Sequence, residues 1–221
     1  PIHPAGNLLS RTTVKRGDLE GAEARTAHVA HGIYQTQMIE HGYMEPECAI
    51  GVPATHRAAR HSLNGDSALA EGVVVQVLSQ SQGVYEDQVQ IAKLLGLSLE
   101  QVRVTLVPNG GGFGGKEDLS VQGHAALMAH LLGAPVKVGL NRDESIAMHP
   151  KRHPVWMDYT VGCDDTGKLT YVRVKFVGDT GAYASVGMKV LERAAGHATG
   201  AYHVPAADIE AYAVYTNNIP C

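Results

Sequence analysis

The feature that most constrains this chain is the glycine-rich stretch Pro108–Asp118, which reads PNGGGFGGKED. Five glycines surround a single phenylalanine there within six residues. Glycine reaches positive φ at little cost and allows another backbone or a ligand to approach closely. The apolar run Val102–Val107 before the stretch predicts a strand, and the apolar spacing over residues 118–132 after it predicts a helix. We therefore expect a loop between a strand and a helix, with at least one glycine at positive φ.

Two common phosphate-binding loops do not fit this stretch. A P-loop requires Ser or Thr after its Gly-Lys pair, whereas Glu117 follows Lys116. A GxGxxG string fits Gly110, Gly112 and Gly115, but no acidic residue ends the next predicted strand about 20 residues on. The end of the loop should lie where the following helix offers free N–H groups to an anion. The competing interpretation is a tight turn that serves close packing.

Composition and charge exclude several classes of partner. The 221 residues carry a net charge of −4, and no basic stripe predicts binding to nucleic acid. No apolar run approaches the length of a membrane span, so we expect no membrane partner. The three cysteines, Cys48, Cys163 and Cys221, form no CxxC pair. This scattered, odd set favours reduced thiols in a cytoplasmic protein.

The apolar patterns predict an α+β chain of mixed and antiparallel sheets with packed helices. Residues 1–16 are expected to be irregular, and Asp18 is the predicted cap of the first helix. A turn at Cys163–Gly167 is expected to join the two strands of a hairpin. Residues 54–71 are polar and predict a surface excursion. Strands are expected at 26–37, 49–52, 72–79, 102–107, 136–140, 155–161, 169–177 and 207–215, and helices at 19–24, 84–95, 118–132 and 186–197. Residues 1–221 are expected to form part of one domain, divided into two packed subdomains at about 1–140 and 141–221.

Several motifs of the chain, in their order, resemble those of one family. GGGFGGKE at Gly110–Glu117 resembles the loop of the molybdenum hydroxylases, the family of xanthine dehydrogenase and aldehyde oxidase. The match is most similar to the molybdenum-binding subunit of bacterial xanthine dehydrogenases of the selenium-dependent type, and it runs from about Leu8 to Cys221. The other matching segments are Glu40–Glu47 (EHGYMEPE), His149–His153 (HPKRH), Asp179–Ser185 (DTGAYAS), Val190–Arg193 (VLER) and Tyr215–Pro220 (YTNNIP). The implied fold is the N-terminal part of the molybdenum cofactor-binding domain of the xanthine dehydrogenase type.

The resemblance implies which residues contact the cofactor. Backbone N–H groups at Phe113, flanked by Gly112 and Gly114, correspond to those that reach the oxo ligand of molybdenum in the family. A glycine-lined loop suits this role because its amides can approach an electron-rich ligand without intervening side chains. Gln82 corresponds to the family's glutamine that donates a hydrogen bond to the same ligand, and a neutral amide can donate without adding charge. Gln80 is the alternative, but the gap-free spacing to the loop favours Gln82.

Glu117 and Arg193 match the two residues that contact the purine in xanthine-specific members. A carboxylate and a guanidinium can hold opposite edges of a polar heterocycle and stabilise charge that develops on its ring. Aldehyde-oxidising members usually carry apolar residues at these positions. The alternatives are an interaction of Glu117 with a helix N-terminus and a solvated helix face at Arg193.

No residue of this chain is expected to bind a metal directly or to act as the catalytic base. The candidate ligands of one segment are Glu40, His41, Glu45, Glu47 and Cys48. Their spacing matches no zinc signature, and the family uses this segment as scaffold. His149 and His153 have HxxxH spacing, but Pro150 interrupts a helix there and no glutamate follows His149. In the family, the base is a glutamate in a later segment, which this sequence does not contain.

The implied activity is hydroxylation of a purine or related N-heterocycle with oxygen derived from water. The implied cofactor is molybdopterin with molybdenum, in its cytosine dinucleotide form. The remaining part of the molybdenum subunit and domains or subunits that carry 2Fe–2S clusters and FAD are the implied partners. The alternatives are an aldehyde-oxidising member of the same family, a non-catalytic assembly fragment that needs partner segments, and a free-standing nucleotide-binding protein.

Overall fold

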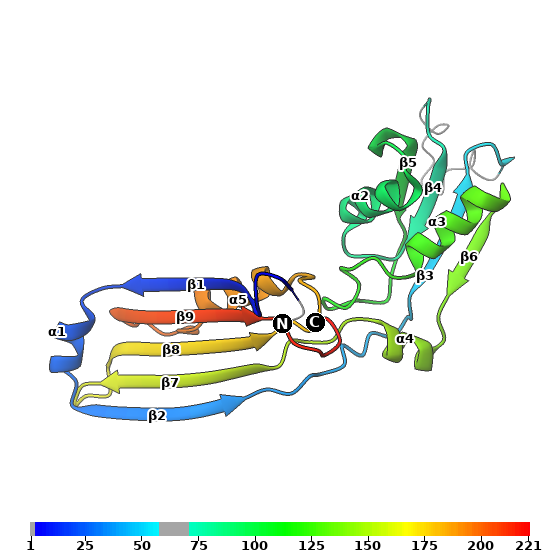
Figure 1. Cartoon of the computed structure of the whole chain (residues 1–221). Coiled ribbons are helices and arrows are strands. Elements are labelled where there is room, and N and C mark those ends of the chain that lie inside the picture. Colours follow the sequence, from blue (N-terminus) through cyan, green and yellow to red (C-terminus); the bar gives the residue numbers. More distant parts are fainter. Residues whose placement is uncertain (1–2, 58–70) are drawn as a thin grey trace. The chain divides into compact units, whose positions relative to one another are not determined.

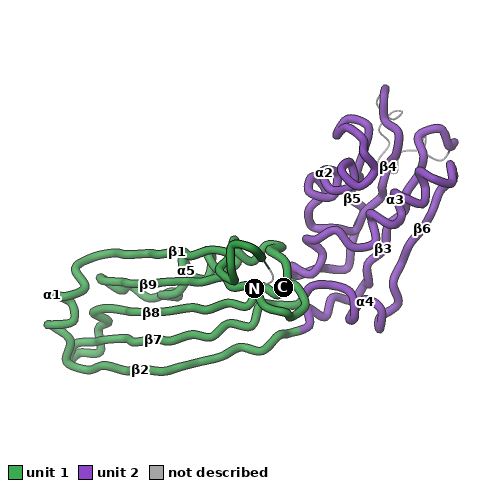
Figure 2. The backbone as a smooth tube through the Cα atoms, viewed as in Figure 1, with its two compact units in different colours: residues 1–39, 151–221 green, residues 40–150 purple. Residues whose placement is uncertain are grey.

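The computed structural model describes residues 3–57 and 71–221. It divides the chain into two compact units (Figure 2). Unit 1 comprises Pro1–Ile39 and Lys151–Cys221, and unit 2 comprises Glu40–Pro150. This division differs from the boundary near residue 140 that the sequence indicates, because unit 1 takes segments from both ends of the sequence. Unit 2 is therefore inserted into the sequence of unit 1.

Unit 1 is built on a mixed sheet with the strand order β1-β9-β8-β7-β2 (Figure 1). Strands β8 and β9 are parallel, and the other neighbours are antiparallel. The parallel pair is joined through the helix α5, Gly187–Gly196. The strands are β1 (Leu8–Arg16), β2 (His28–Gln35), β7 (Val155–Cys163), β8 (Leu169–Asp179) and β9 (Ala206–Val214).

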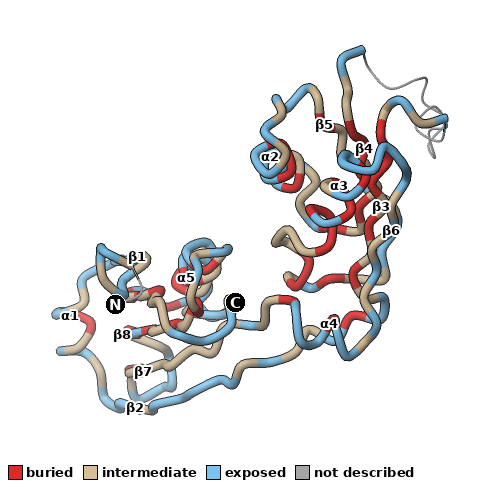
Figure 3. Tube along the Cα trace, turned by 45° about the vertical axis from the view of Figure 1, so that its right-hand side comes forward, coloured by how far each residue is buried: buried red, intermediate tan, exposed pale blue. Residues whose placement is uncertain are grey.

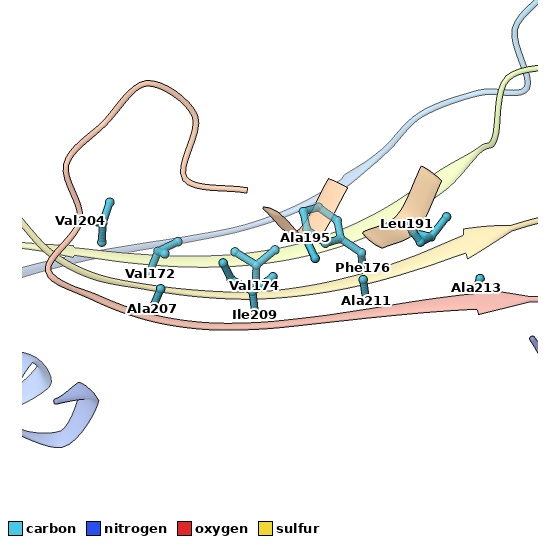
Figure 4. Close-up of a cluster of buried hydrophobic side chains, with 10 residues drawn as sticks. All are labelled: Val172, Val174, Phe176, Leu191, Ala195, Val204, Ala207, Ile209, Ala211 and Ala213. Carbon is cyan, nitrogen blue, oxygen red and sulfur yellow. The ribbon is translucent and has the colours of Figure 1, made fainter. Parts of the chain in front are cut away.

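Alternation along the strands forms the core of unit 1. In β8, Val172, Val174 and Phe176 are buried, whereas Arg173 and Lys175 between them are exposed. Strand β9 contributes three of its buried alanines to this core, and α5 packs over β8 and β9 with Leu191 and Ala195 (Figure 4). Gly178 is required for this packing because a Cβ there would lie 2.6 Å from a methyl group of Leu191. Period-two alternation thus produces one face covered by α5 and one polar face.

Unit 2 is built on a smaller sheet with the order β5-β4-β3-β6. Strands β4 (Val75–Ser79) and β5 (Val102–Leu106) are parallel and are joined through helix α2 (Val84–Leu95) and the short 3₁₀ helix η2 (Leu99–Gln101). Antiparallel pairs join β3 (Cys48–Pro53) to β4 and to β6 (Val136–Gly139). Helices α2 and α3 (Val121–Leu132) pack on this sheet, and their buried residues lie on the sides that face it (Figure 3).

The expected fold class, α+β with mixed sheets and packed helices, is confirmed. Helix α1 (Leu19–Ala24) begins after its cap, Asp18, as predicted. The irregular segment expected at 1–16 is wrong, because residues 8–16 pair with β9 as strand β1. Helix α3 begins at Val121 and not near residue 118, so the end of the glycine loop precedes the helix N-terminus. Most of the excursion expected at 54–71 lies outside the described residues.

One helix of unit 2 was not expected from the sequence. Helix α4 (Arg142–Met148) begins after Asn141, whose side chain accepts from the backbone N–H of Glu144 at 3.0 Å. The Glu144 side chain accepts in turn from the N–H of Asn141 at 2.9 Å. This reciprocal capping box is the sequence signal that identifies the start of α4.

Among the described residues, no helix combines the length and apolar character needed to cross a membrane. All three cysteines carry free thiols.

Candidate functional site

The glycine loop lies in unit 2 between β5 and α3, as the sequence predicts, and residues 110–115 form turns outside regular structure. Gly111 has φ 94° and Gly114 has φ 98°, which confirms the expected positive φ. Phe113 also has a positive φ, 54°, and its side chain is 60% exposed. A non-glycine residue in this conformation is strained, and such strain gathers at functional sites. The backbone around Phe113 is therefore held in an unusual conformation.

Gln82 lies in the turn between β4 and α2 and is bonded to the glycine loop at two points. Its side-chain Oε1 accepts hydrogen bonds from the N–H groups of Gly114, at 3.0 Å, and Lys116, at 3.2 Å. Its backbone N–H donates to the carbonyl of Lys116 at 2.9 Å. Because both side-chain partners are donors, the atom that faces them must be the amide oxygen. Gln82 Nε2 therefore faces away from these amides as a donor, without a partner among the described residues.

Close approach of Gln82 explains the glycine at position 112. A Cβ on residue 112 would lie 2.2 Å from Gln82 Oε1, a distance at which something must shift. Gln80, the alternative candidate, is used differently: its Nε2 donates to Glu45 Oε2 at 3.2 Å and to the Pro108 carbonyl at 3.4 Å. The geometry thus separates the two glutamines, and Gln82 is the one bonded to the amides that follow Phe113.

The segment Glu40–Glu47 supports the loop from another side. Lys116 is 3% exposed, its Nζ donates to the Glu45 carbonyl at 2.8 Å, and the Tyr43 ring centroid is 4.5 Å from Nζ. Burial lowers the pKa of Lys116, while the charges of Glu47 and Glu45 raise it in part. The buried lysine thus ties the end of the loop to a neighbouring segment through a charge-assisted bond and a cation–π contact.

Glu40, His41 and His149 bring one donor atom each to within 4.8 Å of one another, as a metal site would require. Buried His149 also meets a carboxylate at each ring nitrogen: Nε2 lies 2.7 Å from Glu40 Oε1, and Nδ1 lies 3.4 Å from Glu47 Oε1. Tyr43 donates to the same Glu47 oxygen, and burial together with this bond raises the pKa of Tyr43 well above its usual value. Hydrogen bonds join His149 to Glu40 and Tyr43 to Glu47. The absence of a direct metal ligand stays a prediction.

The remaining expected residues fall in different units. Glu117 is half-buried at the end of the glycine loop in unit 2, whereas Arg193 is exposed on α5 in unit 1. His149 belongs to unit 2 and His153 to unit 1, and burial lowers the pKa of His153. The pairing of Glu117 with Arg193 therefore stays a prediction.

Two buried residues near the loop carried no expected role. Lys116 lies in the glycine-rich motif Gly110–Glu117, but nothing in the sequence distinguishes a buried lysine from a solvated one. Asp87 is fully buried in the first turn of α2, behind the turn that carries Gln82. An acidic residue in a first helical turn usually indicates only a favourable interaction with the helix dipole.

Comparisons with known proteins agree with these motifs. The sequence profile of the molybdopterin cofactor-binding domain matches residues 2–221. The chain is 35% identical over 217 residues to a protein of Bacillus subtilis described as a probable xanthine dehydrogenase component, and the match covers 98% of this chain and 27% of that protein. It is 36% identical over 217 residues to the nicotinate dehydrogenase large molybdopterin subunit of Eubacterium barkeri, with 98% and 47% covered.

Solved structures show the same fold at lower identity. The aldehyde oxidoreductase of Desulfovibrio gigas matches with a TM-score of 0.83 at 23% identity, covering all of this chain and 23% of that one. Quinoline 2-oxidoreductase of Pseudomonas putida matches with a TM-score of 0.76 at 23% identity, with 97% and 26% covered. The chain thus spans about a quarter to a half of the length of these relatives. The chain belongs to the molybdopterin cofactor-binding domain family found in xanthine dehydrogenases and related oxidoreductases.

Proposed function

We propose that this chain contacts one side of the metal end of a molybdopterin cofactor in a molybdenum hydroxylase. There it would help to orient a purine or related N-heterocycle for hydroxylation with oxygen derived from water. When bound, the cofactor supplies the redox centre at which the substrate carbon is oxidised. The chain's own residues hold that centre on one side and position the ring; the catalytic base belongs to another segment.

The observation that carries this proposal is the orientation of Gln82. The N–H groups of Gly114 and Lys116 occupy its amide oxygen, so its Nε2 is left to donate to a ligand. The N–H of Phe113, in its strained conformation, has no hydrogen-bond partner among the described residues either. Two neutral donors, Gln82 on the turn between β4 and α2 and Phe113 on the glycine loop, suit an electron-rich oxo group, because they stabilise its charge without titrating. The residues present therefore fit the metal end of the cofactor.

The substrate class rests on chemistry and on the names of two relatives. Xanthine and nicotinate, for which those relatives are named, are both polar N-heterocycles. Glu117 and Arg193 supply an acceptor and a bidentate donor for such a ring. An aldehyde has one polar group and therefore could not occupy both the carboxylate of Glu117 and the guanidinium of Arg193. An aldehyde-oxidising enzyme is the alternative within the family.

The same family membership supports further proposals about the complete protein. The cofactor would be the cytosine dinucleotide form. Electrons would leave through 2Fe–2S clusters to FAD on partner domains or subunits, and the assembly would work in the cytoplasm. The rest of the molybdenum subunit would complete the cavity.

The test compares Gln82→Glu with Gln82→Leu in the complete protein that contains this chain. Glutamate keeps an oxygen for the N–H groups of Gly114 and Lys116 but removes the outward donor. We expect kcat for xanthine to fall by about 10²–10³-fold in both variants, which is the usual effect of removing one hydrogen-bond donor to the developing charge. The molybdenum content of Gln82→Glu should be unchanged. Gln90→Glu is the matched control, because Gln90 is exposed on α2. Wild-type turnover in Gln82→Glu would refute the proposed role, and a preference for aldehydes over purines would favour the alternative.

A further inference from the structure

The turn that carries Gln82 lies on a buried polar network of unit 2. Ser79, the last residue of β4, and Asp87, in the first turn of α2, are both 0% exposed. Ser79 Oγ donates to Asp87 Oδ2 at 3.0 Å. The end of the strand and the start of the helix are thus tied together directly behind the turn formed by residues 80–83.

The Ser79 hydroxyl uses its full hydrogen-bonding capacity in this network. It gives its single hydrogen to Asp87 and accepts from the backbone N–H of Ser81, at 3.2 Å, and from Gln122 Nε2, at 3.3 Å. Ser81 Oγ accepts in turn from the N–H of Gly83 at 3.3 Å. The residues on both sides of Gln82 therefore have their backbone N–H groups held by serines, and the carboxylate of Asp87 orients the first of these hydroxyls.

This arrangement is costly for stability. Asp87 Oδ1 is buried without a hydrogen-bond partner among the described residues. Burial raises the pKa of the Asp87 carboxyl, while the nearby hydroxyl groups of Ser81 and Ser79 lower it in part. An incompletely paired buried carboxyl destabilises a fold, and an apolar residue of similar size would avoid that cost. A role in stability is therefore a poor explanation for an aspartate here.

We propose that Asp87 is a positioning residue for the glycine loop. Through Ser79 and Ser81 it fixes the turn so that Gln82 Oε1 stays on the N–H groups of Gly114 and Lys116 and Nε2 faces away from them. The effect on catalysis rests on the proposed function of Gln82, whereas the effect on loop geometry does not depend on it.

The first experiment measures loop geometry without reference to catalysis. Amide hydrogen exchange is followed at Gly114 and Lys116 in the complete protein, prepared with and without cofactor. Asp87→Leu should speed exchange of these two amides by about tenfold, because the bonds to Gln82 Oε1 weaken. Asp87→Asn, which keeps an oxygen for the Ser79 hydroxyl, should exchange like the wild type. Glu86→Gln is the control, since it removes a charge from the same first turn of α2 but leaves the serines untouched.

Ser81→Ala gives a second route to the same result. It removes the acceptor for the Gly83 N–H without placing an apolar group at position 87, and it should also accelerate exchange at Gly114 and Lys116. If Asp87→Leu does not fold, Ser81→Ala decides the question. Unchanged exchange at both amides in the folded variants would overturn the proposal.

The second experiment asks whether Asp87 acts through Gln82. In the double variant Asp87→Leu/Gln82→Leu, the loss of kcat should be no larger than in Gln82→Leu, because both changes remove the same contact. Losses that multiply would show an effect of Asp87 that does not pass through Gln82 and would overturn the assignment. If the proposed function is wrong, the wild-type protein lacks purine hydroxylase activity or Gln82→Glu keeps wild-type turnover. The exchange difference between Asp87→Leu and Asp87→Asn is still observed in either case.

Discussion

At Gln82, one side chain uses its two ends for different purposes. The carbonyl end is fixed by two loop amides, so the orientation of the amino end follows without a further contact. A carboxylate in the same place would accept the same bonds but would present negative charge to an electron-rich ligand. The resemblance to the family, with its gap-free spacing to the glycine loop, predicts this residue. Its orientation depends on contacts more than 30 residues away that the sequence does not reveal.

We expect Glu117→Ala and Arg193→Met to lower kcat for a purine more than they weaken its binding. Contacts that strengthen as charge develops on the ring act on the transition state and therefore on kcat. Loss of one charge-assisted bond should cost about 2–4 kcal/mol. Arg193→Met should also shift preference toward less polar aldehydes. Steady-state kinetics of the complete protein with xanthine and an aromatic aldehyde measure both effects, and unchanged purine kinetics in the two variants would contradict the assignment.

Asp87 should make stability depend on pH. Because burial raises its pKa in the folded state above the ordinary 3.8, the folded protein binds the proton more tightly than the unfolded chain. The associated stabilisation is complete below pH 3.8 and is lost as pH rises through the folded-state pKa. Asp87→Asn removes this loss, so its free energy of unfolding should rise relative to the wild type between acid pH and neutrality. Urea unfolding at a series of pH values, monitored by hydrogen exchange in unit 2, tests this. Parallel curves of unfolding free energy against pH for the two proteins would disprove it.

At the level of elements, local signals predicted most helices and strands, and non-local pairing explains the failures. Helix α2 begins at Val84 and ends at Leu95, and Gly96 then adopts φ 68°. Both the apolar periodicity of this helix and the glycine that ends it are visible in the local sequence. Strand β1 was missed because its residues are largely polar or half-exposed and become a strand only by pairing with β9, about 200 positions later in the sequence. In the candidate site, the bond between Glu40 and His149, 109 positions apart, was beyond local patterns for the same reason.

The glycine loop should tolerate substitution unevenly. Gly112→Ala places a Cβ 2.2 Å from Gln82 Oε1, so it must displace that side chain and should lower kcat to the level of Gln82→Leu. Gly133→Ala, at the end of α3, meets no atom within 4 Å but retains φ 64°. It should cost about 1 kcal/mol of stability and leave activity intact. Thermal unfolding and xanthine turnover separate the two outcomes, and an active Gly112→Ala protein would show that the close approach is dispensable.

For the whole molecule, the proposed site needs more than this chain. The 221 residues span 27% of the Bacillus subtilis relative and 23% of the Desulfovibrio gigas enzyme. We expect these residues, expressed alone, to hold no molybdenum tightly and to have no hydroxylase activity, because the base and most pterin contacts are assigned to other segments. Metal analysis, pterin extraction and a xanthine assay test this together. Turnover with stoichiometric molybdenum would contradict it.

The insertion of unit 2 into unit 1 has a consequence for the order of folding. Strands β2 and β7 pair directly, Gln35 opposite Trp156, so unit 2 occupies the connection between two adjacent strands and its two ends are held close together. Unit 2 is continuous in sequence and can form its contacts while the ribosome is still synthesising the second half of unit 1. Unit 1 cannot do so, because β1 pairs with β9, the last strand of unit 1 to be synthesised. Bringing these two distant strands together also carries an entropic cost that slows folding. A nascent chain would thus complete the contacts between Gln82 and the glycine loop before it completes the sheet on which α5, the helix that carries Arg193, packs.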